Sequence, residues 1–286
     1  MTWISASLIL FFSSVLVYLF IRKSQELKTD NLINNLALFL IPCFGYLIII
    51  LSQHLSLILN YWHLILILFS AYFFSYLGNV FSLKSLQLAP NPGYSLIISK
   101  SYVVFTSVVS IFLFNSELTL KSIISILLII AFSGLIVIER PSAHKQTLSQ
   151  AWLIYAIGSF FAWGFLALMS KYLIDQGVNI LARLFYLTLF VSLIFLLDVK
   201  KKSLKFSLTK IQWQTLILMG ILSFIFNYCQ QLGYQLGHNP GYINAVNASS
   251  ISLLTLLSAY FFHDELNLRK LIGIFGVTAG LILLLV

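Results

Sequence analysis

A lysine interrupts an apolar run of the sequence. The stretch NPGYSLIISKSY occupies residues 91–102, and a helix that begins at Pro92 would carry Lys100 about 12 Å along its axis, near the middle of a bilayer. A lysine at that depth costs about 2.5 to 3.5 kcal/mol, so its ammonium group should face a watery cavity, a partner or a ligand rather than lipid. Lys100 is therefore a candidate for pairing with a carboxylate or phosphate group of a solute. The alternative is a hydrogen-bonded lysine that holds helices together.

Polar side chains recur at helical spacing on other apolar segments. Asn227, Gln231 and Tyr234 follow one stripe at i, i+4 and i+7, and Asn244 and Asn247 lie one turn apart. These groups could hydrogen-bond a polar solute or bond helix to helix, which contributes about 0.6 kcal/mol per contact in a membrane. The candidate substrate-binding residues, with the aromatic ones as cavity walls, are Tyr76, Asn79, Lys100, Tyr102, Trp163, Asn227, Gln231, Asn244 and Asn247.

The composition is that of an all-α integral membrane protein. Of the 286 residues, 60% are hydrophobic and 9% are charged, and the mean hydropathy is +0.97, whereas soluble domains are about a quarter charged. Continuously apolar segments of about 20 residues predict helices rather than barrel strands, which alternate every second residue. The ten expected spans are 3–21, 32–52, 61–87, 92–114, 119–138, 151–171, 179–197, 212–236, 240–262 and 268–286.

The sequence contains an internal repeat. The tetrad NPGY at 91–94 returns at 239–242, an offset of 239 − 91 = 148 residues. Because Asn, Lys, Glu and Pro are scarce here, their agreement in one register indicates two copies of one unit, residues 1–148 and 149–286. Other matches at this offset are Lys23 with Lys171, Asn31 with Asn179, Asn79 with Asn227, and Glu117 with Glu265.

An odd number of spans in each copy predicts inverted repeats. Five crossings insert the second copy from the opposite side of the membrane, so we expect two inverted five-helix repeats. Many secondary transporters are built in this way, with the solute bound near the bilayer midplane and alternating access as the mechanism. Lys100 corresponds to Ala248 in this register, so the fold itself does not require the charge, which favours a role in specificity.

The repeated tetrads are interpreted as helix starts. Asn91 and Asn239 can cap helices whose first residues are Pro92 and Pro240. Direct solute contact by the tetrad tyrosines is the alternative.

The short acidic turns are interpreted as anchors. Glu117 and Glu265 precede Thr119 and Asn267, which are expected to cap the following helices. Small residues on the last span should allow a neighbouring helix to approach closely. These residues are Gly273, Gly276 and Gly280.

Three stretches carry a family resemblance. AYFFHDELNLRKLIGIFGVTAGLILLL near the end, its counterpart VSIFLFNSELTLKSIISILLIIAFSGLIVI, and FAWGFLALMSKYL resemble the EamA-like branch of the drug/metabolite transporter superfamily. The resemblance implies a ten-helix fold with a central cavity that moves small solutes such as amino acids or nucleobases. Many members have a proline early in the ninth helix, where this chain has Ala248, Ser249 and Ser250. The second half of the cavity is therefore expected to differ in shape.

No pattern of residues indicates an enzyme or a metal site. The eight Asp and Glu residues lie near span ends or in loops, the five His residues lack ligand spacing, and Cys43 and Cys229 have no cluster around them. Proton exchange against a cationic drug through a membrane carboxylate is disfavoured, whereas proton coupling by other groups stays open. We expect no cofactor, no metal and no catalytic residue. The lysine run 200–202 indicates a topology anchor near anionic lipid rather than a nucleic-acid site.

Cations are concentrated on one side of the expected bundle. The richer side holds Arg22, Lys23, Lys28, Arg140, Lys145, Lys200, Lys201, Lys202, Lys205, Lys210, Arg269 and Lys270. The opposite side holds Lys121, Lys171 and Arg183. The positive-inside rule makes the richer side cytoplasmic and places both termini outside, whereas the family resemblance implies cytoplasmic termini.

These observations predict a multi-pass secondary transporter of the plasma (inner) membrane. Its partners would be the lipid bilayer and a small polar solute, anionic or zwitterionic, such as an amino acid or a nucleobase-like compound. The alternatives are an exporter of neutral amphiphilic compounds and a non-transporting membrane enzyme or accessory subunit. The identity of the solute, the direction of transport, the coupling ion and the oligomeric state do not follow from the sequence.

Overall fold

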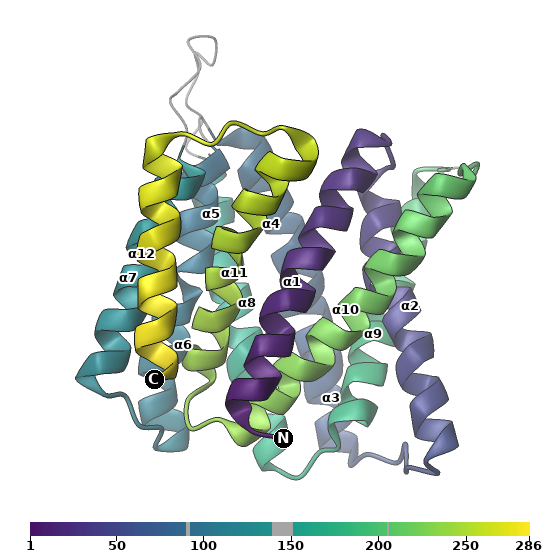
Figure 1. Ribbon diagram of the computed structural model, residues 1–286. Helices are drawn as coiled ribbons and strands as arrows, with labels where there is room; N and C mark the ends of the chain where they lie inside the picture. The colour runs from purple at the N-terminus through teal and green to yellow at the C-terminus, as the bar shows by residue number, and fades with distance from the viewer. Residues whose placement is uncertain (90–91, 139–150, 205) are drawn as a thin grey trace.

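The computed structural model describes residues 1–89, 92–138, 151–204 and 206–286 as a bundle of helices, with no strand among them (Figure 1). Within the described residues, ten helical segments are long and apolar enough to cross a membrane, which confirms the predicted fold class. Predictions that involve Asn91, Arg140, Lys145 and Lys205 fall outside the described residues. The elements are α1 (Trp3–Glu26), α2 (Asn31–Ser52), α3 (Tyr61–Phe69), η1 (Ser70–Tyr76), α4 (Leu77–Leu88), α5 (Pro92–Lys100), α6 (Tyr102–Phe114), α7 (Leu120–Val137), α8 (Ala151–Asp175), α9 (Ile180–Lys201), α10 (Lys210–Leu236), α11 (Pro240–Phe262) and α12 (Leu268–Leu285).

Two of the predicted continuous helices are interrupted. The third span contains the π-helical segment η1 between α3 and α4. The fourth span breaks at Ser101, whose ψ of −6° departs from the helical value and whose hydroxyl donates a hydrogen bond to the Ile97 carbonyl at 2.7 Å. Lys100 is the last residue before this break, whereas the corresponding α11 runs without interruption. Irregular backbone at membrane depth occurs where it is buried in protein or lines a cavity.

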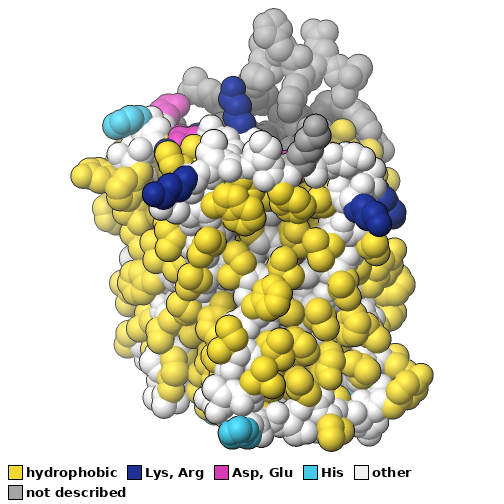
Figure 2. Space-filling view, turned by 90° about the vertical axis from the view of Figure 1, so that its right-hand side faces the viewer, with side chains coloured by type: hydrophobic (Ala, Val, Ile, Leu, Met, Phe, Trp, Pro, Cys, Tyr) yellow, Lys and Arg dark blue, Asp and Glu magenta, His cyan; other side chains and the backbone are white. Residues whose placement is uncertain are grey.

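The outer surface of the bundle is apolar. Figure 2 shows hydrophobic side chains over most of one face, with Lys and Arg near its upper rim. Phe112 and Phe275 are 80% and 74% exposed, which would be costly in water and is favourable against lipid tails. The surface therefore fits a bilayer, in agreement with the composition.

Helices from the two halves of the sequence pack side by side. α1 packs along α10, α4 along α8, α2 along α9 and α7 along α12, and both termini lie at the same end of the bundle (Figure 1). The helix bounds also repeat at an offset of 148 residues: α7 spans Leu120–Val137, and α12 spans Leu268–Leu285. Two inverted repeats would give these correspondences. The division near residue 148 and the inverted relation remain predictions.

The predicted helix caps form where the structure describes them. Asn239 accepts a hydrogen bond from the Gly241 amide at 2.8 Å, and Pro240 is the first residue of α11. Thr119 caps α7 and Asn267 caps α12 through hydrogen bonds to backbone amides. The second tetrad, residues 239–242, and the acidic turns therefore act as helix starts, as the sequence predicts.

Glycines bring α12 against α7. A Cβ atom added at Gly273 would lie 2.9 Å from the Phe132 carbonyl oxygen, and one at Gly280 would lie 3.0 Å from the Ser125 carbonyl oxygen. At Gly276 an added Cβ would overlap the Phe132 ring. The predicted packing role of these glycines is confirmed. At all three positions the helices are too close for any side chain larger than the hydrogen atom of glycine.

A central cavity as candidate functional site

A cavity of about 530 Å³ lies between helices of both halves of the chain. Its lining residues come from α1, α2, η1, α4, α5, α6, α8, α9, α10 and α11. Arg22, Gln25 and Asn31, at the end of α1 and the start of α2, line one end and are exposed. Arg183, near the start of α9, also lines the cavity and is 1% exposed. The cavity therefore opens at the end of the bundle opposite the termini and is closed near the start of α9.

Most of the predicted site residues meet in this cavity. The lining includes Asn79, Lys100, Tyr102, Trp163, Asn227, Gln231 and Asn247. They come from six helices of both halves, so the juxtaposition is produced by the tertiary fold and not by neighbouring positions in the sequence. Their assignment as solute contacts remains a prediction.

Lys100 is weakly held by protein groups. Its Nζ atom lies 3.4 Å from the Tyr18 hydroxyl and 5.5 Å from the centre of the Tyr18 ring. The first distance is long for a hydrogen bond, and the second is within the range of a cation–π contact. No carboxylate of the described residues lies within 4.0 Å of it, and none lines the cavity. The ammonium group, which has three N–H donors, therefore retains donors for a bound acceptor.

Asn79 and Asn227, which correspond at the offset of 148, have the same local geometry. The Asn79 amide donates to the Ser75 carbonyl at 2.9 Å, and the Asn227 amide donates to the Ser223 carbonyl at 2.8 Å. Each bond reaches back four residues along its own helix and fixes the side chain beside the cavity. The carbonyl oxygen Oδ1 of each side chain is then available as an acceptor for a solute N–H or O–H group.

Asn247 connects α11 to α1. Its Oδ1 atom accepts a hydrogen bond from the Ser14 hydroxyl at 2.9 Å, and Ser14 also lies 3.1 Å from the Ser250 hydroxyl. Asn247 and Ser250 are almost fully buried. Asn247 therefore positions two cavity helices relative to each other and also borders the cavity.

Two predicted site residues do not line the cavity. The Tyr76 hydroxyl donates to Asp198 at 2.7 Å, and its ring packs against Phe195, so the side chain is directed at α9. Asn244 is fully buried and bonds Tyr234 at 2.6 Å. Tyr76 and Asn79 are three residues apart, so their side chains point about 60° apart on a helix. Asn79 lines the cavity, and Tyr76 does not. Both hydrogen bonds join neighbouring helices, which favours the interhelical interpretation for Tyr76 and Asn244.

This placement gives a prediction for Tyr76. Tyr76→Phe should lower the thermal unfolding midpoint by a few degrees, because it removes one hydrogen bond to a carboxylate, worth about 1 to 2 kcal/mol. Solute affinity should stay within about twofold of the unmodified protein. Asn79→Ala, at a cavity-lining position on the same span, is the matched comparison and should weaken binding. Loss of solute binding in Tyr76→Phe at unchanged stability would contradict the placement of Tyr76 outside the site.

Arg183 lines the cavity. Its place in the sequence had grouped it with the few cations at the ends of spans on the cation-poor side of the bundle. It is in the first turn of α9, and its guanidinium donates to Gln231 at 2.8 Å and to Ser170 at 2.5 Å. One signal could have identified it: at the offset of 148 it matches Asn35, a second polar residue inside an apolar segment. Asn35 also lines the cavity.

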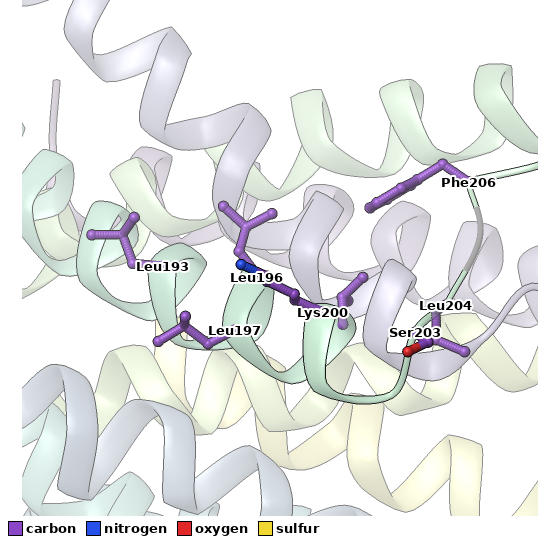
Figure 3. Close-up of a pocket in the computed structure, with 8 residues that line it drawn as sticks. Leu193, Leu196, Leu197, Lys200, Ser203, Leu204 and Phe206 are labelled. Carbon is purple, nitrogen blue, oxygen red and sulfur yellow. The ribbon is translucent and has the colours of Figure 1, made fainter.

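A second pocket lies on the outer side of α9 and of the segment that follows it (Figure 3). Its volume is about 720 Å³, and its walls include Leu193 and Leu197, which are 47% and 57% exposed. Lys200 also borders this pocket and brings a positive charge to it. An apolar groove on the lipid-facing surface suits acyl chains, so the central cavity is the candidate site for a polar solute.

The fold and the cavity define a multi-pass helical membrane protein with a cavity between two halves, lined by apolar side chains and a set of polar ones. The sequence model of the EamA-like transporter family matches residues 150–286. This match over the second half of the chain confirms the resemblance drawn from the sequence.

Two known proteins extend this comparison to the rest of the chain. An uncharacterized transporter of Archaeoglobus fulgidus is 25% identical over 228 residues, covering 77% of this chain and 76% of that relative. A protein of known crystal structure superposes with a TM-score of 0.79 over 98% of this chain and 96% of its own, at 15% identity. At that identity the likeness shows the fold alone. The family match and the relative of Archaeoglobus fulgidus support a membrane transporter and point away from an enzyme.

Proposed function

We propose that this protein is a secondary transporter of a small anionic or zwitterionic metabolite, such as an amino acid or a nucleobase-like compound, in the plasma (inner) membrane. The observation that carries the proposal is the position of Lys100, a cation on the wall of the central cavity that lies near Tyr18 and has no carboxylate partner among the described residues. A fixed charge in a partly desolvated cavity attracts a solute of opposite charge more strongly than the same charge in water.

Transport would occur by alternating access. In this proposal residues 1–148 and 149–286 are inverted repeats that exchange conformations around a bound solute, so that the cavity opens to each side in turn. The break between α5 and α6 places Lys100 where the backbone departs from a continuous helix, a feature that the matching helix α11 lacks. Asn79, Asn227, Gln231 and Asn247 would hydrogen-bond the solute, and Tyr102 and Trp163 would form walls.

Charge placement favours an orientation. Arg22 lies at the open end of the cavity, at the same end of the bundle as the lysines that close α9. By the positive-inside rule this end is cytoplasmic. The structure would then have its cavity open to the cytoplasm and its termini outside, whereas family resemblance favours the reverse.

A set of matched solutes tests the proposed function. Purified protein should be stabilised against heat by acidic solutes, for example glutamate, but less by the corresponding amide glutamine and least by the amine 1,4-diaminobutane. Proteoliposomes should accumulate the same acidic solutes. Stabilisation by neutral amphiphiles with no response to any acid would favour the exporter of neutral compounds. Turnover of a solute into a product without a gradient would instead indicate an enzyme.

A further inference from the structure

Arg183 is a buried cation with an incomplete set of partners. It is 1% exposed and donates to two neutral acceptors, Gln231 and Ser170. Its Nε atom is buried and has no hydrogen-bond partner among the residues that the structure describes. Guanidinium carries five N–H donors and stays charged, so two neutral acceptors leave both charge and donors uncompensated.

A structural ion pair does not account for this residue. Among the described residues no Asp or Glu lies within 4.0 Å of Arg183, whereas Arg22, at the open end of the same cavity, pairs with Asp264 at 3.3 Å. Burial of a charge without a counter-charge is strongly unfavourable. A buried arginine that lines a cavity and lacks an acidic partner is the arrangement expected if the counter-charge comes with a ligand.

The repeat shows that the fold does not need either cation. Arg183 corresponds to Asn35 in the first half, and Lys100 corresponds to Ala248 in the second half. Both cations line the same cavity, and each half contributes one of them. The two charges are therefore features of this chain's cavity and not of the repeated helices.

The two cations lie at different depths. Lys100 is about 12 Å from the start of α5, and Arg183 is about 5 Å from the start of α9, which begins at the opposite end of the bundle. In a span about 30 Å long, these two depths leave roughly 13 Å between the two backbones along the bundle axis. The side chains extend into this distance. One group at mid-depth and one at the closed end would suit a ligand with two separated anionic groups.

We infer that Arg183 is a second anion-binding residue and that the preferred solute carries two negatively charged groups, one paired with Lys100 and one with Arg183. This inference rests on the proposed function. The planar guanidinium can bind a carboxylate or phosphate through two parallel N–H bonds, and Gln231 and Ser170 hold it in place for that contact. Dicarboxylates, acidic amino acids and phosphorylated acids share this chemistry.

The test compares linear dicarboxylates of four to eight carbons with monocarboxylates of the same length. Binding to the full chain in detergent is measured by calorimetry, with Arg183→Gln, Arg183→Lys and Lys100→Gln as variants and melting curves as a check of folding. In the unmodified protein we expect one dicarboxylate length to bind at least about tenfold more tightly than its monocarboxylate. Arg183→Gln should remove that advantage, because it weakens dicarboxylate binding by a much larger factor than monocarboxylate binding. Arg183→Lys should retain part of it.

The outcomes separate the inference from the proposed function. If the unmodified protein binds mono- and dicarboxylates equally at every length, the inference is overturned and the proposed function stands. If Arg183→Gln weakens both classes by the same factor, Arg183 is structural, and the inference is again overturned. If no acidic solute binds the unmodified protein, both fall together. Should Arg183→Gln fail to fold, a dicarboxylate advantage that persists undiminished in Arg183→Lys would also overturn the inference, because lysine lacks the guanidinium fork.

Discussion

Lys100→Gln is expected to weaken binding of acidic solutes by about 100-fold and to leave binding of their amides nearly unchanged. Two unit charges 4 Å apart at an effective dielectric constant near 20 attract by about 4 kcal/mol, part of which is offset by desolvation, and each 1.4 kcal/mol corresponds to a tenfold change. Glutamine keeps most of the side-chain volume and a hydrogen-bonding end, so the substitution removes mainly the charge. Calorimetric titration and proteoliposome uptake measure the effect.

Two further variants separate charge from geometry. Lys100→Arg should keep most of the preference for acids, because the positive charge remains. Lys84→Gln removes a lysine from α4 that does not line the cavity and instead lies 5.3 Å from the Tyr155 ring centre. It should leave solute binding unchanged, although it alters the net charge equally. Unaltered uptake and affinity for acids in Lys100→Gln would remove this lysine from the mechanism.

The sequence predicted the spans because length and apolarity are local properties. Each predicted span matches one helix or a run of two or three consecutive helical segments, and caps such as Asn267 form where residue type and position predict them. The helix interruptions were missed. A π-helical segment and the turn at Ser101 depend on hydrogen bonds that compete within one helix, and serine and tyrosine at those positions are equally compatible with a regular helix.

The lining of the central cavity was predicted in part, for reasons of geometry. Lys100 was identified because a charge at mid-depth is costly wherever its side chain points. Tyr76 and Asn244 bond to neighbouring helices and do not line the cavity. Helical spacing could not predict this, because an uncharged polar group is satisfied as well by a neighbouring helix as by a cavity. Arg183 was missed because a cation one turn inside a span can reach the interface or turn inward, and only the tertiary structure decides.

Gly273→Ile is expected to be the most destabilising of the single substitutions considered. Position 273 lies where α12 meets the backbone of α7, and an added Cβ would be 2.9 Å from the Phe132 carbonyl oxygen and 2.7 Å from the Ile136 side chain. A carbonyl in a helix cannot move alone, so the two helices must separate. That separation also loses the close contacts on which association within a membrane depends. We expect a cost of about 2 to 3 kcal/mol and a fall in both the melting temperature and the yield of folded protein.

A matched control exists on the same helix. Ala279 is exposed on α12, so Ala279→Ile adds a similar bulk that meets lipid and should leave the melting temperature nearly unchanged. The pair separates steric conflict at the α7–α12 contact from any general effect of a β-branched residue in the helix. Because α7 and α12 contribute no described residue to the cavity lining, the Gly273→Ile protein that does fold should retain its solute affinity. Equal melting temperatures for the two variants would mean that α7 and α12 do not need this close approach.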